Sequence, residues 1–230
     1  MANLRVVGAG DSVNWYKGGW EIFKSNIANW VLMTLILLVL MAVAIFIPFV
    51  GPIALYLVLP VLLGGMFYSA QKLDQGQTAD IMDLFALFKD QQRLTPLIIL
   101  GLIFLVVGFL SSMIVGGMMV ASMSTMAPGQ MSVMPSFGFG VILLSLLISV
   151  LSLMLFMFAV PLIVFKNMST IDAIKNSFTA NLKNFPAFII FVVIYLVLAI
   201  IAAIPFGLGF LVLAPVMVAA TYVAYKNIFA

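Results

Sequence analysis

Histidine and cysteine are both absent from the 230 residues, and charged residues make up only 7% of the chain. The chain therefore lacks the commonest metal ligands, the usual general base near neutral pH, and every thiol nucleophile or disulfide. A hydrolase, a zinc site and a thiol redox relay are not expected. About a quarter of the residues in soluble domains are charged, so this composition also argues against an ordinary soluble globule.

Hydrophobic residues are abundant instead, at 65% of the chain with a mean hydropathy of +1.30. A helix that crosses a membrane needs about 17 to 25 apolar residues. Six segments reach that length: 30–50, 52–70, 94–120, 139–165, 185–204 and 206–225. Proline and glycine place tight turns inside the first and third pairs, and no signal-peptide pattern precedes the first segment. The sequence predicts an all-α, polytopic membrane protein with six transmembrane helices arranged as three hairpins.

The charged residues lie on one side of this predicted topology. The ten basic residues form four groups: Arg5, Lys17 and Lys24; Lys72, Lys89 and Arg93; Lys166, Lys175 and Lys183; and Lys226. The seven acidic residues lie in the same segments, whereas the three opposite loops carry no charge. By the positive-inside rule, both termini are expected in the cytoplasm. No ionisable residue is left for the middle of the membrane, where proton relays and voltage sensors keep theirs.

A short amphipathic segment with helical spacing precedes each predicted hairpin. Apolar residues recur there every three or four positions, and polar residues occupy the other side. The apolar sides are Val13, Tyr16, Trp20, Phe23 and Ile27; Ile81, Leu84, Phe85 and Phe88; and Ile171, Ile174, Phe178, Leu182 and Phe185. Thr78 and Ser169 are the expected N-caps of the second and third segments. All three segments are expected to lie in the membrane plane as interfacial helices.

Comparison of the chain with itself indicates a loose internal repeat. A shift of 155 residues places Phe23 and Asn26 opposite Phe178 and Asn181. The repeated units are about 11–70, 78–165 and 169–229, and together they form a single integral membrane domain. All three share one orientation, unlike the inverted repeats of many secondary transporters. The alternative is that any interfacial helix carries such aromatic and amide residues, without common ancestry.

The stretch from Pro161 to Phe178 reads Pro-Leu-Ile-Val-Phe-Lys-Asn-Met-Ser-Thr-Ile-Asp-Ala-Ile-Lys-Asn-Ser-Phe. It resembles a segment of uncharacterised bacterial inner-membrane proteins, the YciC-like group and the membrane domain associated with glycerophosphoryl diester phosphodiesterases. The resemblance is close over this stretch and looser over the other hairpins. It implies a six-helix inner-membrane protein of proteobacterial type and brings no catalytic residues. The chain has no phosphodiesterase domain, so the resemblance does not imply phosphodiesterase activity.

The leading functional hypothesis is a non-enzymatic, membrane-organising or accessory protein. Its interfacial helices would bind membrane lipids, or a membrane-protein partner, from the cytoplasmic face. The side chains expected to insert among acyl chains are Trp20, Phe23, Trp30, Phe178 and Phe185. Those expected to contact lipid phosphates are Lys24, Lys175 and Lys183.

The middle loop predicted on the opposite face is rich in methionine. Thioether sulfur is a ligand for Cu(I), and Met119, Met123 and Met126 are the candidate ligands. Methionine is also an ordinary apolar residue of membrane helices, and packing is the competing interpretation. No other cofactor is expected.

Small residues and prolines raise two further possibilities. Gly108, Ser112 and Gly116 repeat every fourth position, which favours close helix packing within the chain, or a homo-oligomer as the less favoured alternative. Pro60, Pro161 and Pro215 interrupt spans and free backbone carbonyls that could line a path through the membrane. The second functional hypothesis is therefore a transporter or channel for a neutral or amphipathic solute.

Catalysis and nucleic-acid binding have little support in the sequence. No nucleophile is accompanied by an evident base. Asp80 and Asp83 stand three residues apart, as a metal-binding pair would, but they also suit the first turn of a helix. The net charge of +3 is spread over four segments, whereas nucleic-acid recognition needs a clustered basic face.

Overall fold

The computed structural model describes residues 4–124 and 139–229, and all of the regular structure in these ranges is helical. The elements are α1 (Asp11–Lys24), α2 (Ile27–Ile45), α3 (Val50–Asp74), the 3₁₀ helix η1 (Ile81–Lys89), α4 (Gln91–Ser124), α5 (Phe139–Phe156), α6 (Ala159–Lys166), α7 (Thr170–Lys183), α8 (Phe185–Ala203) and α9 (Phe210–Phe229). Within the described residues, six segments are long and apolar enough to cross a membrane, with α5 and α6 forming one of them. The chain is a multi-pass membrane protein, and the predicted all-α, six-span fold class is confirmed.

Two turns close the hairpins α2–α3 and α8–α9 where proline and glycine predict them. Gly51 packs directly on the backbone of Ala44, and Gly209 lies so close to Ala202 that a Cβ atom would come within 2.5 Å of its Cα. No other residue fits there without moving the partner helix, because glycine alone lacks Cβ. Gly207, with φ +82°, supplies the left-handed turn before α9.

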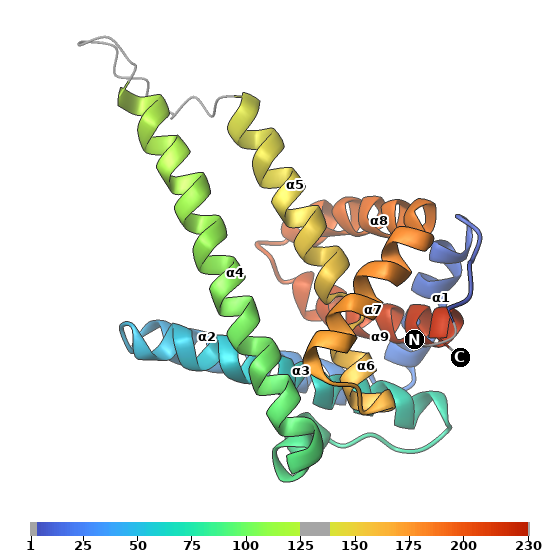
Figure 1. Cartoon of the computed structure of the whole chain (residues 1–230). Coiled ribbons are helices and arrows are strands. Elements are labelled where there is room, and N and C mark those ends of the chain that lie inside the picture. Colours follow the sequence, from blue (N-terminus) through green and yellow to red (C-terminus); the bar gives the residue numbers. More distant parts are fainter. Residues whose placement is uncertain (1–3, 125–138, 230) are drawn as a thin grey trace.

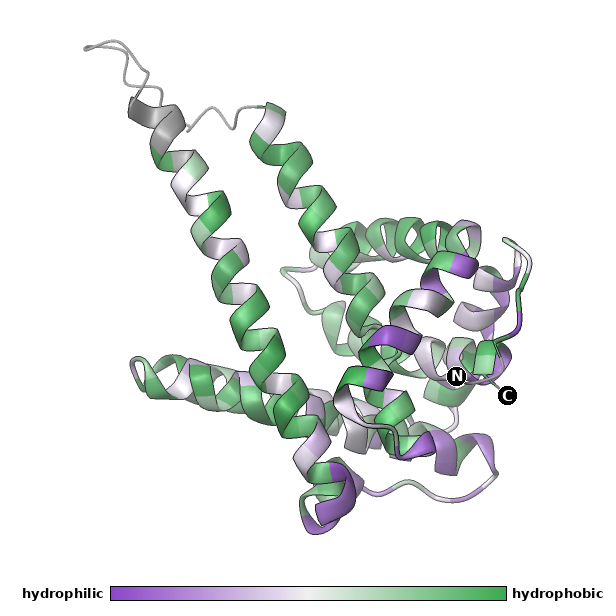
Figure 2. Ribbon diagram, in the orientation of Figure 1, coloured by the Kyte–Doolittle hydropathy of each residue, from purple (hydrophilic) through white to green (hydrophobic). Residues whose placement is uncertain are grey.

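The hairpins diverge from a common polar end, called the base here (Figure 1). The base consists of α1, η1, α6 and α7 with the adjoining ends of α3, α4, α8 and α9. Both chain termini lie there, and the backbone N–H of Arg5 donates to the carbonyl of Ile228 at 2.9 Å. Figure 2 shows hydrophilic residues gathered at the base and apolar residues along the hairpins. The opposite ends are called the tips.

The short base helices η1 and α7 each pack against the hairpin that comes before them in the chain. Helix α1, which has no hairpin before it, packs against the last one. Helix η1 packs on α2 and α3, helix α7 on α5 and α6, and helix α1 on α8 and α9. Two of these contacts are too tight for a side chain. A Cβ atom on Gly65 of α3 would collide with the carbonyl of Leu84 in η1, and one on Gly19 of α1 would lie 2.6 Å from the backbone nitrogen of Ala220 in α9. The base helices therefore hold the hairpins together.

The fourth predicted span is broken in two. The helix stops after Phe156 and restarts at Ala159, although no charged residue or proline stands at the break. Helix α7 satisfies the backbone groups at the break. The Ser177 hydroxyl accepts from the Phe158 N–H at 3.0 Å and donates to the Met154 carbonyl at 2.9 Å, and the Asn181 amide also donates to Met154. A buried helix break is stable only when such partners exist.

The N-cap predictions were correct for one helix and wrong for the other. Ser169 caps α7, accepting from the backbone N–H of Asp172. The cap of η1 is Asp80, not Thr78. Asp80 and Asp83 form a reciprocal capping box, in which each carboxylate accepts a backbone N–H near the other residue. The ammonium group of Lys72 also donates to both oxygens of the Asp83 carboxylate, each at 2.9 Å. Both acidic residues therefore have partners within the protein.

Candidate functional site

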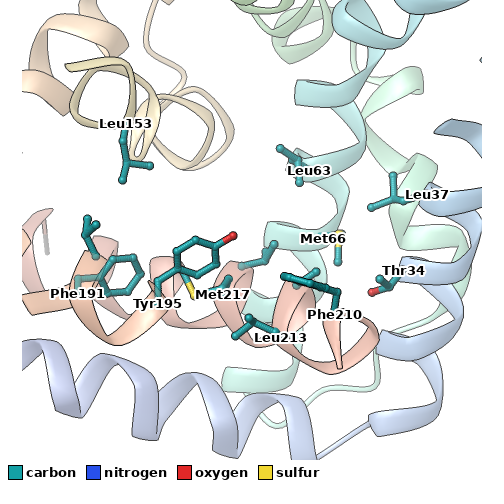
Figure 3. Close-up of a pocket in the computed structure, with 13 residues that line it drawn as sticks. Thr34, Leu37, Leu63, Met66, Leu153, Phe191, Tyr195, Phe210, Leu213 and Met217 are labelled. Carbon is teal, nitrogen blue, oxygen red and sulfur yellow. The ribbon is translucent and has the colours of Figure 1, made fainter. Parts of the chain in front are cut away.

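An apolar cavity of about 400 Å³ lies between the three hairpins (Figure 3). Its volume is within the range of pockets that bind small molecules, roughly 300 to 1,000 Å³. Five helices line it: α2 with Thr34 and Leu37, α3 with Leu63 and Met66, α5 with Leu153, α8 with Phe191, Val192 and Tyr195, and α9 with Phe210, Leu213, Ala214, Met217 and Val218. No charged side chain is among them.

Two hydroxyls are the polar side-chain groups in the lining. Thr34 donates its hydroxyl to the Trp30 carbonyl at 2.9 Å, one turn earlier in α2, so it presents little free polarity to the cavity. Tyr195 makes no hydrogen bond within the described part of the chain, and the residue is 36% exposed. The cavity therefore favours an apolar occupant and offers at most one hydroxyl to it.

The floor of the cavity, on the base side, is closed by aromatic packing. Tyr16 of α1 stacks on Phe191 with ring centroids 4.8 Å apart, and its hydroxyl donates to the Phe191 carbonyl at 2.9 Å. Trp30, only 1% exposed, donates its indole N–H to the carbonyl of Ile22 in α1. Burial, and then the proximity of Tyr195, raises the pKa of Tyr16 above its ordinary range. The base core separates the cavity from the charged end.

The cavity lies at the depth of the hydrocarbon. Thr34 stands seven residues into α2 and Phe191 six residues into α8, counted from the base ends of these helices. At 1.5 Å per residue these positions are about 10 Å from the base ends. The hydrocarbon core of a bilayer is about 30 Å thick, so with the base at the membrane surface these residues stand at the level of the acyl chains.

The predicted lipid-contacting residues divide into a surface group and a buried group. Trp20, Lys24, Lys175, Lys183 and Phe185 are exposed, and Phe178 is half-buried. Lys24 also pairs with Glu21 at 2.9 Å.

For two of these residues, the predicted insertion among acyl chains is wrong. Phe23 and Trp30 are only 2% and 1% exposed, so they cannot insert among acyl chains. The physical reason is that the inner face of α1 packs on α9 and α8, and that the start of α2 lies beneath the cavity. These aromatic side chains belong to the protein core.

Among the predicted packing residues of α4, only Gly108 meets another helix. A Cβ atom on Gly108 would lie 3.5 Å from the Tyr56 hydroxyl of α3, whereas one on Gly116 would have nothing within 4 Å. Ser112 is exposed and donates to the carbonyl of Gly108 within its own helix. Close packing within the chain is therefore a wrong prediction for Ser112 and Gly116, because α4 and α5 leave a groove of about 440 Å³ at this level. The homo-oligomer alternative stays a prediction.

The three interior prolines do not surround the cavity. Pro60, Pro161 and Pro215 are buried, and none of them is a lining residue. Pro161 belongs to the base helix α6, whereas Pro60 and Pro215 stand beside lining residues in the sequences of α3 and α9 without lining the cavity themselves. This cavity is therefore not the predicted proline-lined path, which stays a prediction.

The methionine site cannot be placed in the structure. Met126 and the side chains of Met119 and Met123 lie outside the described residues. In the part of the chain that the structure describes, no group of three or more acidic side chains could hold a metal ion.

The cavity itself is not evident in the sequence. Its residues come from five helices and are the same apolar types that face lipid elsewhere. Thr34 and Tyr195, as polar residues inside spans, were the only available signal. Comparisons with protein-family models, curated proteins and solved structures gave no match.

Proposed function

We propose that this chain is a non-enzymatic lipid-binding protein of the bacterial inner membrane, with its base in the cytoplasm. The single observation that carries lipid binding is the apolar cavity, which lies at hydrocarbon depth and is lined without charge. An acyl chain is the apolar group that a bilayer presents there. The membrane assignment rests on the resemblance to inner-membrane proteins, and the orientation on the basic residues at the base.

The exposed faces of α1 and α7 support a second lipid contact at the membrane surface. Exposed apolar side chains alternate there with lysines, as Trp20 does with Lys17 and Lys24. Such a face suits the interface, where rings sit among headgroups and lysines reach phosphate. The base helices would then both clamp the hairpins and rest on the inner leaflet.

Lipid retention tests the cavity. The wild-type protein, extracted gently and examined by native mass spectrometry, should retain phospholipid. Ala214→Phe places a ring in the cavity, and we expect it to reduce retained lipid several-fold. Ala42→Phe is the matched control, because Ala42 is an exposed helical alanine outside the lining. Equal retention by the two variants would rule out the cavity as the site.

The surface contact has its own test. Replacing Trp20 and Phe178 by serine should weaken binding of purified protein to nanodiscs rich in anionic lipid, while leaving the lipid in the cavity in place. Unchanged binding would leave the base helices with only a clamping role.

Transport of a neutral or amphipathic solute is the competing function. The closed aromatic floor favours binding over passage, because a solute would have to displace Tyr16 and Trp30. Flux of a lipid-like solute through proteoliposomes, abolished by Ala214→Phe, would favour the transporter.

A further inference from the structure

The chain consists of three successive units, each a base helix followed by a hairpin: α1–α3, η1–α6 and α7–α9. Helices α2 and α8 each have 19 residues and begin at residues 27 and 185, a shift of 158. The same shift relates Ser12 to Thr170 and Asn26 to Asn184. The packing therefore supports a register three residues from the sequence-based one, and it pairs Phe23 with Asn181, both buried.

Matching residues of the first and third units make matching contacts with the unit before them. The Ser12 hydroxyl donates to the Ala187 carbonyl near the start of α8, and the Thr170 hydroxyl donates to the Pro96 carbonyl near the start of α4. In α3 and α9, where the shift is 155, Gly65 and Ala220 occupy the same position and receive η1 and α1. The units are thus arranged in a ring, with α1 of the first unit packed on the last.

Asparagines at the helix starts repeat this order. Asn26 donates its side-chain amide to the carbonyl of Ala79, which precedes η1. Asn184 donates to the carbonyl of Arg5 and accepts from the N–H of Val7, just before α1. In each case the first spanning helix of a unit holds the segment that leads into the next base helix of the ring.

The three boundaries of the ring are not closed equally at hydrocarbon depth. Between the first and second units, α3 and α4 are in close contact, with Gly101 against the backbone of Tyr56 and Leu57. Between the third and first units, α9 packs on α2 and α3. Between the second and third units, α5 and α8 share no extensive contact within the described residues.

The open boundary leads to the cavity. Leu153 of α5 and Tyr195 of α8 line the cavity from opposite sides of the boundary, and they are 39% and 36% exposed (Figure 3). Towards the base the same boundary is sealed by α6 and α9, where Phe158 and Phe229 meet edge to face at 5.5 Å. The opening therefore faces sideways into the bilayer.

We propose that the acyl chain of a membrane phospholipid enters the cavity laterally, between α5 and α8, while its headgroup stays outside. The absence of charge in the lining leaves the headgroup without a partner inside, and the apolar walls suit the chain. This inference rests on the proposed lipid binding and adds its route.

The absence of cysteine makes the route directly testable. In a Leu153→Cys, Val192→Cys double variant, a flexible bismaleimide added to membranes joins α5 to α8. Native mass spectrometry then follows the replacement of bound lipid by a deuterated phospholipid. We expect several-fold slower exchange in the crosslinked protein than in the same variant without crosslinker. Ile53→Cys with Leu105→Cys is the control, since these residues lie on α3 and α4, which are already in contact.

The outcomes separate the two proposals. Lipid that is bound but exchanges equally fast after the α5–α8 crosslink would overturn the lateral route and leave lipid binding intact. A protein that retains no lipid even before crosslinking would overturn both. Slowing by the control pair to the same extent would show that rigidity of the hairpins, rather than the α5–α8 opening, governs exchange, and this too would overturn the route.

Discussion

The base and the tips of the hairpins are built on different principles. At the base, glycines bring the backbones of different units into contact, and buried serine and asparagine side chains complete the hydrogen bonds. Towards the tips, α4 and α5 carry side chains that are mostly exposed, such as Phe109 at 63% and Leu146 at 58%. Lipid tails are as apolar as these residues, so the bilayer itself solvates the outer halves. The contacts that hold different units together are therefore concentrated at the base, whereas the tips keep only the tight turns within each hairpin.

The largest expected effect comes from Gly65. Gly65→Leu places a side chain against the backbone of η1, which cannot move aside as a side chain can. We expect a loss of about 3 kcal/mol of stability, measured by thermal unfolding in detergent. Gly116→Ala in the outer part of α4 is the control. Nothing lies within 4 Å of its Cβ, so it should be neutral or add up to about 1 kcal/mol through helix propensity. Equal losses of stability in the two variants would contradict the proposed difference between base and tips.

Ser177 gives the next largest effect. Ser177→Ala removes a partner from the Phe158 N–H and the Met154 carbonyl at the break between α5 and α6. An orphaned buried polar group costs about 1 to 3 kcal/mol, and we expect about 2 here. Ser149→Ala, whose exposed hydroxyl bonds only within α5, should change stability by less than about 0.5 kcal/mol. A Ser177→Ala variant as stable as this control would mean that the break needs no partner.

Asp83 tests the polar part of the base. Asp83→Ala removes the ion pair with Lys72 and half of the capping box, and should cost about 1.5 kcal/mol. The exposed Glu21–Lys24 pair provides the comparison, and Glu21→Ala should have almost no effect because solvent screens it. Chemical denaturation at low and high salt measures both. A cost for Glu21→Ala equal to that for Asp83→Ala would contradict the importance of burial.

Tyr16 gives the smallest effect at neutral pH. Tyr16→Phe loses one hydrogen bond to the Phe191 carbonyl, worth about 1 kcal/mol. Because burial raises the folded-state pKa of Tyr16, its stabilising contribution is complete below the ordinary value of 10.0 and declines as the pH rises above that value. Wild type should therefore lose more stability than Tyr16→Phe between pH 9 and pH 11. Parallel losses in thermal midpoint over this range would show that Tyr16 ionises as freely in the folded protein as in the unfolded chain.

Composition and periodicity were enough to predict the all-α class, the six spans and the two proline-glycine turns. Those features depend on local properties, namely the length of an apolar run and the backbone freedom of glycine. The burial of Phe23 and Trp30 in the protein core could not be predicted in the same way. Periodicity identifies an apolar face but does not say whether lipid or protein covers it, and in a membrane the two are chemically alike.

The sequence by itself determined that this chain spans a membrane and that its charges gather at one end. The cost of placing charge or unpaired backbone groups in hydrocarbon depends on the residues of the segment itself, and not on the helices that it packs against. Only the tertiary structure decided which hairpin each base helix clamps, that α5 breaks from α6 opposite Ser177, and that a cavity remains between the three hairpins. These features depend on contacts between residues far apart in the chain, and apolar residues of similar size leave no trace of them in the sequence.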